Sequence, residues 1–186
     1  MNKCLFLDRD GTIIKFGDGY NFLPEKTELI KGVSALIAKF CRAGYKIIVI
    51  TNQGGIARGL YTEKDVYAVN DKINELLAPD GGKIDDIFFC PHDEKGVIEE
   101  FKIKCSCRKP EPLLLERAVK KHNADRAKSL FIGDNYNDRL CAEKVHVRFY
   151  PLEFRHVLST SHGFRTEINE YSPELIQNIF DFAENA

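Results

Sequence analysis

Two aspartates separated by a single residue are the first feature of this sequence that could do chemistry. Asp8 and Asp10 lie in the segment DRDGT, which directly follows the apolar run Cys4–Leu7. Such a run is typical of a buried parallel strand, and ligands of open α/β sheets bind beyond the carboxyl ends of the strands. One aspartate there could belong to a loop or a cap. Two carboxylates followed by Gly-Thr indicate a reactive or metal-binding site.

A second carboxylate pair follows another predicted strand. Asp134 and Asp138 come after the apolar run Ser129–Ile132. The carboxyl ends of parallel strands meet at one edge of a sheet, so we expect these aspartates to approach Asp8 and Asp10. Clustered carboxylates repel one another, which raises their pKa values, unless a hard divalent cation lies among them. Mg²⁺ suits oxygen ligands and keeps positions open for water and phosphate, so the sequence predicts a magnesium site.

Groups that could hold an anion occur at two other places in the chain. The run Lys46–Ile50 ends in TNQGG, where Thr51, Asn52 and Gln53 offer a hydroxyl and two amides beside backbone N–H groups that could form an anion-binding nest. Arg108 and Lys109 precede a predicted helix. Turn-forming residues alone would give a similar pattern, so neither motif decides the function by itself.

Four cysteine and histidine residues form two close pairs. Cys90 and His92 are separated by one residue, as are Cys105 and Cys107. A Cys₃His set is common in structural zinc sites, although both spacings here are tighter than the usual gap of about two to four residues. The alternative is a loop with free thiols. The remaining cysteines fall in apolar periodic stretches and are expected to be buried thiols: Cys4, Cys41 and Cys141.

Strand-like and helix-like segments alternate along the chain. We predict strands at 4–7, 46–50, 86–90, 129–132 and 145–149, and helices at 28–43, 62–78, 112–122, 137–144 and 172–184. This alternation predicts an α/β fold with a Rossmann-like parallel sheet and helices on both faces. At 186 residues the chain fits a single domain, 1–186, with a zinc-binding loop at about 90–109.

Composition argues against several classes of function. The chain has 27 basic and 28 acidic residues and a net charge of −1, so no global field favours nucleic acid or a membrane surface. We find no apolar run of about 20 residues and no secretory signal, and therefore expect a cytoplasmic protein without membrane contact. We also expect a monomer.

The motifs together resemble a known family. The set DxDGT, Thr51, Lys109 and GDxxxD, in this order at strand ends, is similar to the haloacid dehalogenase superfamily of phosphotransferases over roughly residues 3–140. The resemblance implies that Asp8 attacks phosphorus to form an aspartyl-phosphate. It also implies that Asp10 protonates the leaving group and then activates water. Thr51 and Lys109 would stabilise the transferring phosphoryl group.

The same resemblance implies the metal ligands. Mg²⁺ would be held by Asp8, by the main-chain carbonyl of Asp10 and by Asp134. Asp138 is expected beside these ligands rather than on the ion. About 40 residues separate Asp10 from Thr51, which is too few for a large cap domain, so the site should be open.

Further motifs narrow the resemblance to one branch. CPH, CxCRKP and TNQxGIARG look like the branch that contains D-glycero-D-manno-heptose-1,7-bisphosphate 7-phosphatase and histidinol-phosphate phosphatase. This implies a structural zinc ion on the loop and places Arg108 beside the substrate. The segment Gly17–Tyr20, with Gly19 and Tyr20, would also line the substrate site, and Asn52 and Gln53 are further candidates for substrate contacts.

Two departures from the pattern of this branch leave the identity of the substrate undecided. Asn135 stands where the heptose enzymes usually carry lysine, and Phe149–Arg155 could either stack on a nucleotide or form an edge strand packed on the core. The first hypothesis is a phosphomonoesterase acting on a small phosphorylated substrate, namely a sugar phosphate, a bisphosphate or histidinol phosphate. The alternatives are a polynucleotide 3′-phosphatase acting on a nucleic acid end, and a non-catalytic zinc-stabilised binding domain.

Overall fold

Five short apolar segments form one parallel sheet, which confirms the predicted fold class. The structure is a computed structural model and describes residues 1–16, 19–152, 156–160, 163–167 and 170–185. The strand order is β3-β2-β1-β4-β5, and each neighbouring pair runs parallel. The strands are β1 (Cys4–Leu7), β2 (Lys46–Asn52), β3 (Asp86–Cys90), β4 (Leu130–Gly133) and β5 (Arg148–Pro151).

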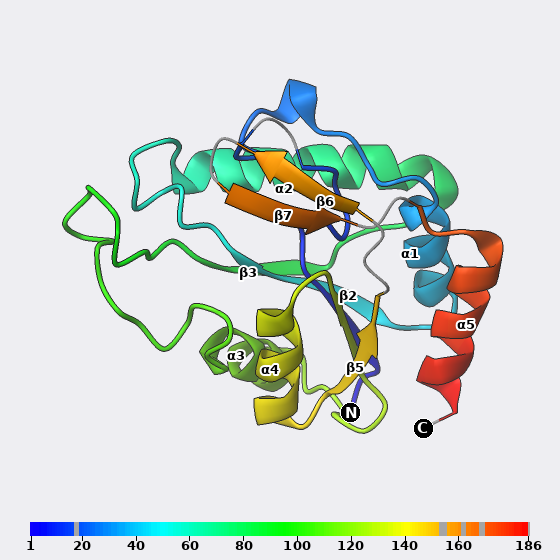
Figure 1. The fold of residues 1–186 in the computed structure, drawn as a ribbon. Coiled ribbons are helices and arrows are strands. Elements are labelled where there is room, and N and C mark those ends of the chain that lie inside the picture. Colours follow the sequence, from blue (N-terminus) through cyan, green and yellow to red (C-terminus); the bar gives the residue numbers. More distant parts are fainter. Residues whose placement is uncertain (17–18, 153–155, 161–162, 168–169, 186) are drawn as a thin grey trace.

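Helices cover both faces of this sheet (Figure 1). Successive residues of a strand point to opposite faces, so Leu5 and Leu7 pack in one core while Cys4 and Phe6 pack in the other. The first core is formed with α1, α2 and α5, and the second with α3 and α4. The helices are α1 (Val33–Arg42), α2 (Glu63–Leu77), α3 (Leu113–Lys121), α4 (Tyr136–Val145) and α5 (Pro173–Glu184).

The predicted caps explain where two helices begin. Thr62 and Asp65 form a reciprocal capping box at the start of α2. At the start of α5 the Ser172 hydroxyl oxygen accepts a hydrogen bond of 3.2 Å from the Leu175 N–H, and Pro173 occupies the first turn. Local sequence therefore sets both starts.

The predicted start of the first helix at Glu28 was wrong. Leu29 pairs in a β-bridge with Ile14, and the Ile30 N–H donates to the Ile13 carbonyl at 2.9 Å. Gly32 then adopts a left-handed conformation, with φ of 82°. A Cβ at this position would lie 2.1 Å from the Tyr171 carbonyl oxygen, so only glycine fits. Tertiary pairing thus overrides the helical pattern until Val33.

The region after α4 also differs from the prediction. α4 runs to Val145, so β5 begins at Arg148 instead of Val145. We predicted no element between β5 and α5, where β6 (His156–Thr160) pairs antiparallel with β7 (Gly163–Glu167) as a separate two-stranded sheet. In the part of the chain that the structure describes, no helix is long and apolar enough to cross a bilayer.

Candidate functional site

A cavity of about 250 Å³ opens at the carboxyl ends of β1, β2 and β4. The chain runs outward from β1 to β2 and β3 and then returns to β4 on the other side of β1, so this edge is a topological switch point, where α/β sheets bind ligands. Every predicted catalytic, substrate-contacting and magnesium residue lines the cavity: Asp8, Asp10, Gly19, Tyr20, Thr51, Asn52, Gln53, Arg108, Lys109 and Asp134. Gly17 and Asp18, in the same predicted loop, lie outside the described residues.

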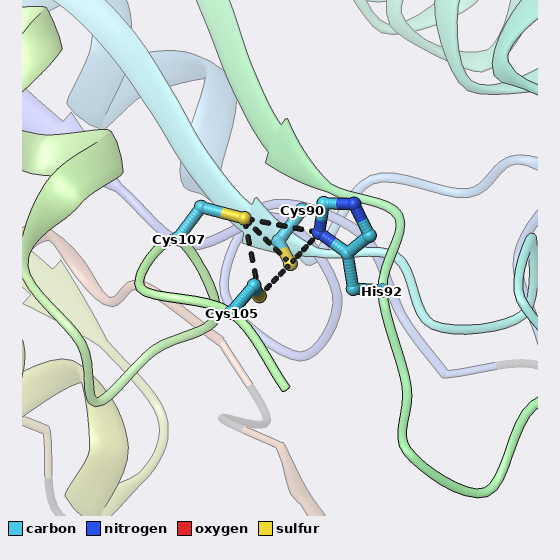
Figure 2. A group of neighbouring side chains, drawn as sticks. All are labelled: Cys90, His92, Cys105 and Cys107. Atoms are coloured by element: carbon cyan, nitrogen blue, oxygen red, sulfur yellow. Dashed lines mark hydrogen bonds between the residues drawn. The ribbon is translucent and has the colours of Figure 1, made fainter. Parts of the chain in front are cut away.

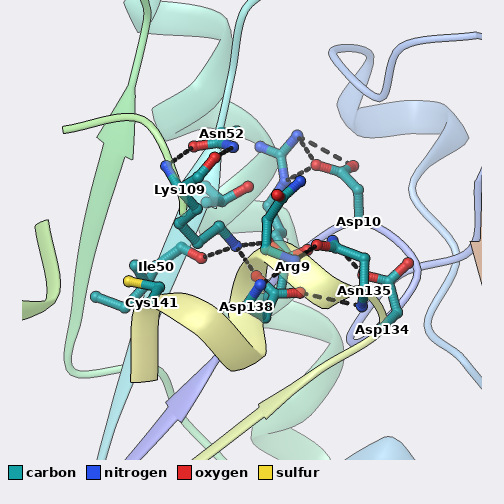
Figure 3. Close-up of polar contacts among 12 residues, drawn as sticks. Arg9, Asp10, Ile50, Asn52, Lys109, Asp134, Asn135, Asp138 and Cys141 are labelled. Carbon is teal, nitrogen blue, oxygen red and sulfur yellow. Dashed lines mark hydrogen bonds and ion pairs between the residues drawn. The ribbon is translucent and has the colours of Figure 1, made fainter. Parts of the chain in front are cut away.

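Lys109 is buried at the floor of the cavity and holds two carboxylates (Figure 3). Its Nζ lies 2.8 Å from Asp8 Oδ1 and 2.6 Å from Asp138 Oδ1, and it donates to the Ile50 carbonyl at 2.7 Å. Burial disfavours the charged ammonium, but the carboxylates of Asp138 and Asp8 outweigh this effect and raise the pKa of Lys109. All three ammonium protons have acceptors, so Lys109 is a fixed positive charge.

Asp8, Asp134 and Asp138 form a buried carboxylate cluster. One oxygen from each residue lies within 4.8 Å of the others. Burial, followed by the charges of Asp8 and Asp138, raises the pKa of Asp134 well above its ordinary value. Burial also raises the pKa of Asp138 to about 6, although Lys109 opposes this shift. One ammonium balances at most one of three carboxylates, so the cluster has the chemistry of a divalent cation site.

Asp10 points its carboxylate away from this cluster. Arg9 donates from Nε to Asp10 Oδ2 at 3.1 Å and from Nη2 to Oδ1 at 3.2 Å. Asn21 donates to Oδ1 at 2.7 Å, and Gln53 donates to Oδ2 at 2.9 Å. Asp10 is thus oriented separately from Asp8, as two carboxyl groups with different roles require.

Asn52 supports Lys109 through the main chain. Its side chain donates to the Lys109 carbonyl at 3.0 Å and accepts from the Lys109 N–H at 2.9 Å. This two-point contact joins the end of β2 to the segment before α3. The amide was predicted to contact substrate, and in this arrangement both of its ends are occupied by backbone.

Two arginines lie at the cavity wall with one acid between them. Arg58 donates to Asp93 Oδ2 at 2.8 and 3.1 Å, and Arg108 Nη2 lies 4.0 Å from the same oxygen. Burial alone would raise the pKa of Asp93, but hydrogen bonds from the Lys95 N–H and from Arg58 lower it. Arg108 also donates to the His92 carbonyl at 2.9 Å, which ties it to the cysteine loop. The arginines leave net positive charge beside the cavity.

The four predicted zinc ligands converge in the structure (Figure 2). Cys107 Sγ lies 3.2 Å from the sulfurs of Cys90 and Cys105 and 3.2 Å from His92 Nδ1, and the Cys90 and Cys105 sulfurs are 3.5 Å apart. A tetrahedral zinc site with metal–sulfur bonds of about 2.3 Å has sulfur–sulfur edges of roughly 3.8 Å. No disulfide joins these cysteines. The set therefore fits a closed four-coordinate site.

Several cavity residues were not predicted as site residues: Phe16, Asn21, Gly54, Arg58, Tyr61 and Asp93. Arg58 belongs to the TNQxGIARG motif and could have been selected from it. Arg9 lies within DRDGT, is fully buried and contacts Asp10. An arginine between two aspartates at the end of a strand could have indicated this contact. The motif gives no signal for Tyr61 or Asp93, because their contacts depend on how separate loops fold together.

Cys4 and Cys141 are buried as predicted, whereas the same prediction for Cys41 was wrong, because its thiol is half-buried near the Lys83 carbonyl. Tyr150 and Leu152 pack on the first core and Phe149 on the second, which supports the edge-strand interpretation of this segment over a nucleotide-stacking surface. Residues 153–155 lie outside the described part of the chain.

Comparison with known proteins identifies relatives across most of the chain. Residues 3–164 match the family described as Polynucleotide kinase 3 phosphatase. A D-glycero-beta-D-manno-heptose-1,7-bisphosphate 7-phosphatase from Rhodopseudomonas palustris is 38% identical over 148 residues, which cover 80% of this chain and 82% of that protein.

Solved structures show the same fold. A putative HAD-like phosphatase from Mesorhizobium loti has a TM-score of 0.83 and 29% identity, covering 99% of this chain and 87% of that one. The D,D-heptose 1,7-bisphosphate phosphatase from B. bronchiseptica, complexed with magnesium and phosphate, has a TM-score of 0.68 and 32% identity and covers 78% of this chain and 77% of its own. The chain therefore belongs to the Polynucleotide kinase 3 phosphatase family, among the haloacid dehalogenase-like phosphatases.

Proposed function

We propose that the chain is a magnesium-dependent phosphomonoesterase that acts on a sugar phosphate or bisphosphate of the heptose bisphosphate type. The observation that carries the proposal is the position of Asp8. It lies at the switch point of the sheet, 2.8 Å from buried Lys109, within a cluster of three carboxylates and on the wall of the cavity. The names of the relatives support the substrate class.

The residues supply both halves of a phosphoryl transfer. A carboxylate oxygen of Asp8 attacks phosphorus, which forms the aspartyl–phosphorus bond and breaks the bond from phosphorus to the leaving oxygen. Asp10 gives a proton to that oxygen and then, as a carboxylate, takes a proton from the water that attacks the aspartyl-phosphate. Inorganic phosphate leaves and Asp8 is regenerated.

Lys109 and Thr51 act on the charge of the transferred group. Lys109 fixes one oxygen of Asp8, so the other oxygen is available for attack. Thr51 is buried at the end of β2 and presents its hydroxyl at the cavity. Donors and cations that are already in place stabilise charge that develops in the transition state.

We assign the cation site to Asp8 and Asp134, with the main-chain carbonyl of Asp10 as a further ligand. When bound there, Mg²⁺ would neutralise charge on the phosphoryl oxygens. Asp138 holds Lys109 and lies beside these ligands. The negative charge that the cluster carries beyond Lys109 supports this assignment, as does the magnesium in the B. bronchiseptica relative.

We also propose that Zn²⁺ is held by Cys90, His92, Cys105 and Cys107 in a structural role. A four-coordinate set has no open position for a water nucleophile. Arg108 and Lys109 directly follow Cys107, the last of the four ligands, so the ion would fix the start of the segment that enters the active site. Because one sheet joins both hydrophobic cores, we propose a single phosphatase domain.

The test is turnover by Asp8→Asn, which removes the nucleophile with almost no change in volume. The purified variant should lose at least about 10³-fold in kcat because the aspartyl-phosphate cannot form, while its circular dichroism spectrum should show that it remains folded. A panel of heptose and hexose phosphates, histidinol phosphate and 3′-phosphorylated oligonucleotides identifies the substrate class. Wild-type turnover by Asp8→Asn would refute the mechanism, and a preference for the oligonucleotide would move the proposal to a polynucleotide 3′-phosphatase.

A further inference from the structure

Gln53 lies in the cavity wall and links the two halves of the proposed active site. Its side chain is buried, with 2% of the residue exposed. Nε2 donates to Asp10 Oδ2 at 2.9 Å and to Thr51 Oγ1 at 3.0 Å. Oε1 accepts from Arg9 Nη2 at 3.0 Å and from the Tyr61 hydroxyl at 2.7 Å. A glutamine side chain has two donor hydrogens and two acceptor sites, so its capacity is fully used.

Tyr61 and Arg9 determine which way the Gln53 amide faces. Both are donors to Oε1, and an amide turned by 180° would place its NH₂ group against them. The Tyr61 hydroxyl remains protonated because burial raises its pKa. The ring is held in place, since it stacks on Phe22 with centroids 5.4 Å apart and fills the space where Gly55 has no Cβ.

The amide orientation has consequences for two reacting groups. Asp10 receives a neutral donor on Oδ2 in addition to Arg9, which fixes the plane of the carboxyl that must reach the leaving oxygen. Thr51 Oγ1 accepts a hydrogen from Gln53, so its own hydroxyl hydrogen is free to point toward a phosphoryl oxygen. Gln53 thus sets the direction of the Asp10 carboxyl and the rotamer of the Thr51 hydroxyl.

We propose that Gln53, held by Tyr61 and Arg9, is a positioning residue that orients the Asp10 carboxyl and the Thr51 hydroxyl together. This replaces the sequence-based expectation that Gln53 contacts substrate, because no donor or acceptor of the amide is left over. The inference rests on the proposed function, in which Asp10 is the general acid and Thr51 contacts the phosphoryl group.

The test compares two leaving groups in Tyr61→Phe and Gln53→Glu. An alkyl phosphate, such as the best sugar phosphate of the panel, needs a proton on its leaving oxygen, whereas p-nitrophenyl phosphate releases a phenolate that is stable without one. The ratio of the two kcat/KM values therefore reports how well Asp10 is placed. A loss that arises only from weakened folding lowers both values equally and leaves the ratio unchanged.

Tyr61→Phe removes one hydroxyl and keeps the ring. The loss of one hydrogen bond should lower kcat/KM for the alkyl ester about fivefold to tenfold and leave that for the aryl ester within about twofold. Gln53→Glu keeps the shape but replaces both donors with acceptors. It turns the Thr51 hydroxyl toward position 53, so both esters should slow, with the alkyl ester falling at least about tenfold further.

Tyr67→Phe is the matched control. Tyr67 is half exposed, packs edge-on against Phe89 and lies outside the cavity lining, so its variant should keep both rates. Equal losses for the two esters in Tyr61→Phe, or an unchanged ratio in Gln53→Glu, would overturn the positioning role while wild-type turnover still stands. The proposed function fails on a different result, namely turnover that survives Asp8→Asn.

Discussion

Replacing Lys109 with methionine should destabilise the protein in a way that depends on pH. The substitution keeps the length of the side chain and removes the cation that lies 2.8 Å from Asp8 and 2.6 Å from Asp138. Breaking a buried ion pair by removing one partner costs about 3 to 5 kcal/mol, because the remaining charge is buried without compensation. For a chain of this size that corresponds to a fall of roughly 10 °C in Tm at pH 7.5 without added Mg²⁺.

The pH dependence follows from the carboxylates left behind. In the wild type Lys109 opposes the rise in the pKa of Asp138, which stands at about 6, and of Asp134. Without Lys109 both pKa values rise further. A carboxyl whose pKa is higher in the folded state stabilises the fold below its unfolded pKa and loses that stabilisation as pH rises through the folded pKa. The variant should therefore lose less free energy of unfolding, relative to wild type, at pH 5 than at pH 7.5.

The assay is urea unfolding of wild type and Lys109→Met at both pH values in buffer without added Mg²⁺. Lys144→Met is the control, because Lys144 pairs with Glu111 at 3.1 Å while both side chains are more than 40% exposed. The free energy of unfolding of Lys144→Met should fall by less than about 1 kcal/mol at either pH. A deficit for Lys109→Met below about 1 kcal/mol, or one that is equal at pH 5 and pH 7.5, would refute this account of the buried cluster.

Two further predictions concern the metals. Protein purified without chelator should contain about one zinc per chain. The double variant Cys105→Ser, Cys107→Ser should lose the zinc, and its activity should fall because Arg108 and Lys109 are displaced. Metal analysis that finds zinc at full occupancy in the double variant would contradict the site. Mg²⁺ should raise Tm more at pH 7.5 than at pH 5, because the raised pKa values of Asp134 and Asp138 make cation binding compete with protons. An equal increase at both pH values would contradict this linkage.

Elements whose signal is local could be predicted from the sequence. The strand Cys4–Leu7 matches β1 residue for residue because an apolar run that ends in aspartates has few other structures available. The capping box at Thr62 likewise fixes the start of α2 within its own turn. By contrast, α1 begins at Val33 because of contacts with Ile14 and with the Tyr171 carbonyl, residues well separated from it in the chain. No local pattern encodes those contacts.

The candidate site also has parts that local sequence predicts and parts that depend on distant contacts. Residue type and position at a strand end were enough to bring Asp8, Thr51 and Asp134 to one cavity, because parallel strands share an edge. The tasks of the amides at the end of β2 could not be deduced, since an amide offers the same groups to substrate, backbone or another side chain. In the structure Asn52 pairs with the Lys109 backbone and Gln53 with four polar side chains.

Saturation of the Gln53 amide limits how the site can discriminate substrates. Gln53 can contact substrate only by giving up a buried hydrogen bond, which costs about 1 to 3 kcal/mol for the group left unpaired. Asn52 is engaged at one donor and one acceptor by the Lys109 backbone. Contacts with the leaving group must therefore come mainly from groups with spare capacity at the cavity wall. Arg58 and Arg108 have five donors each and are partly exposed. Substitutions at these arginines should alter substrate preference, whereas substitutions at Gln53 should alter the rate for every phosphate ester.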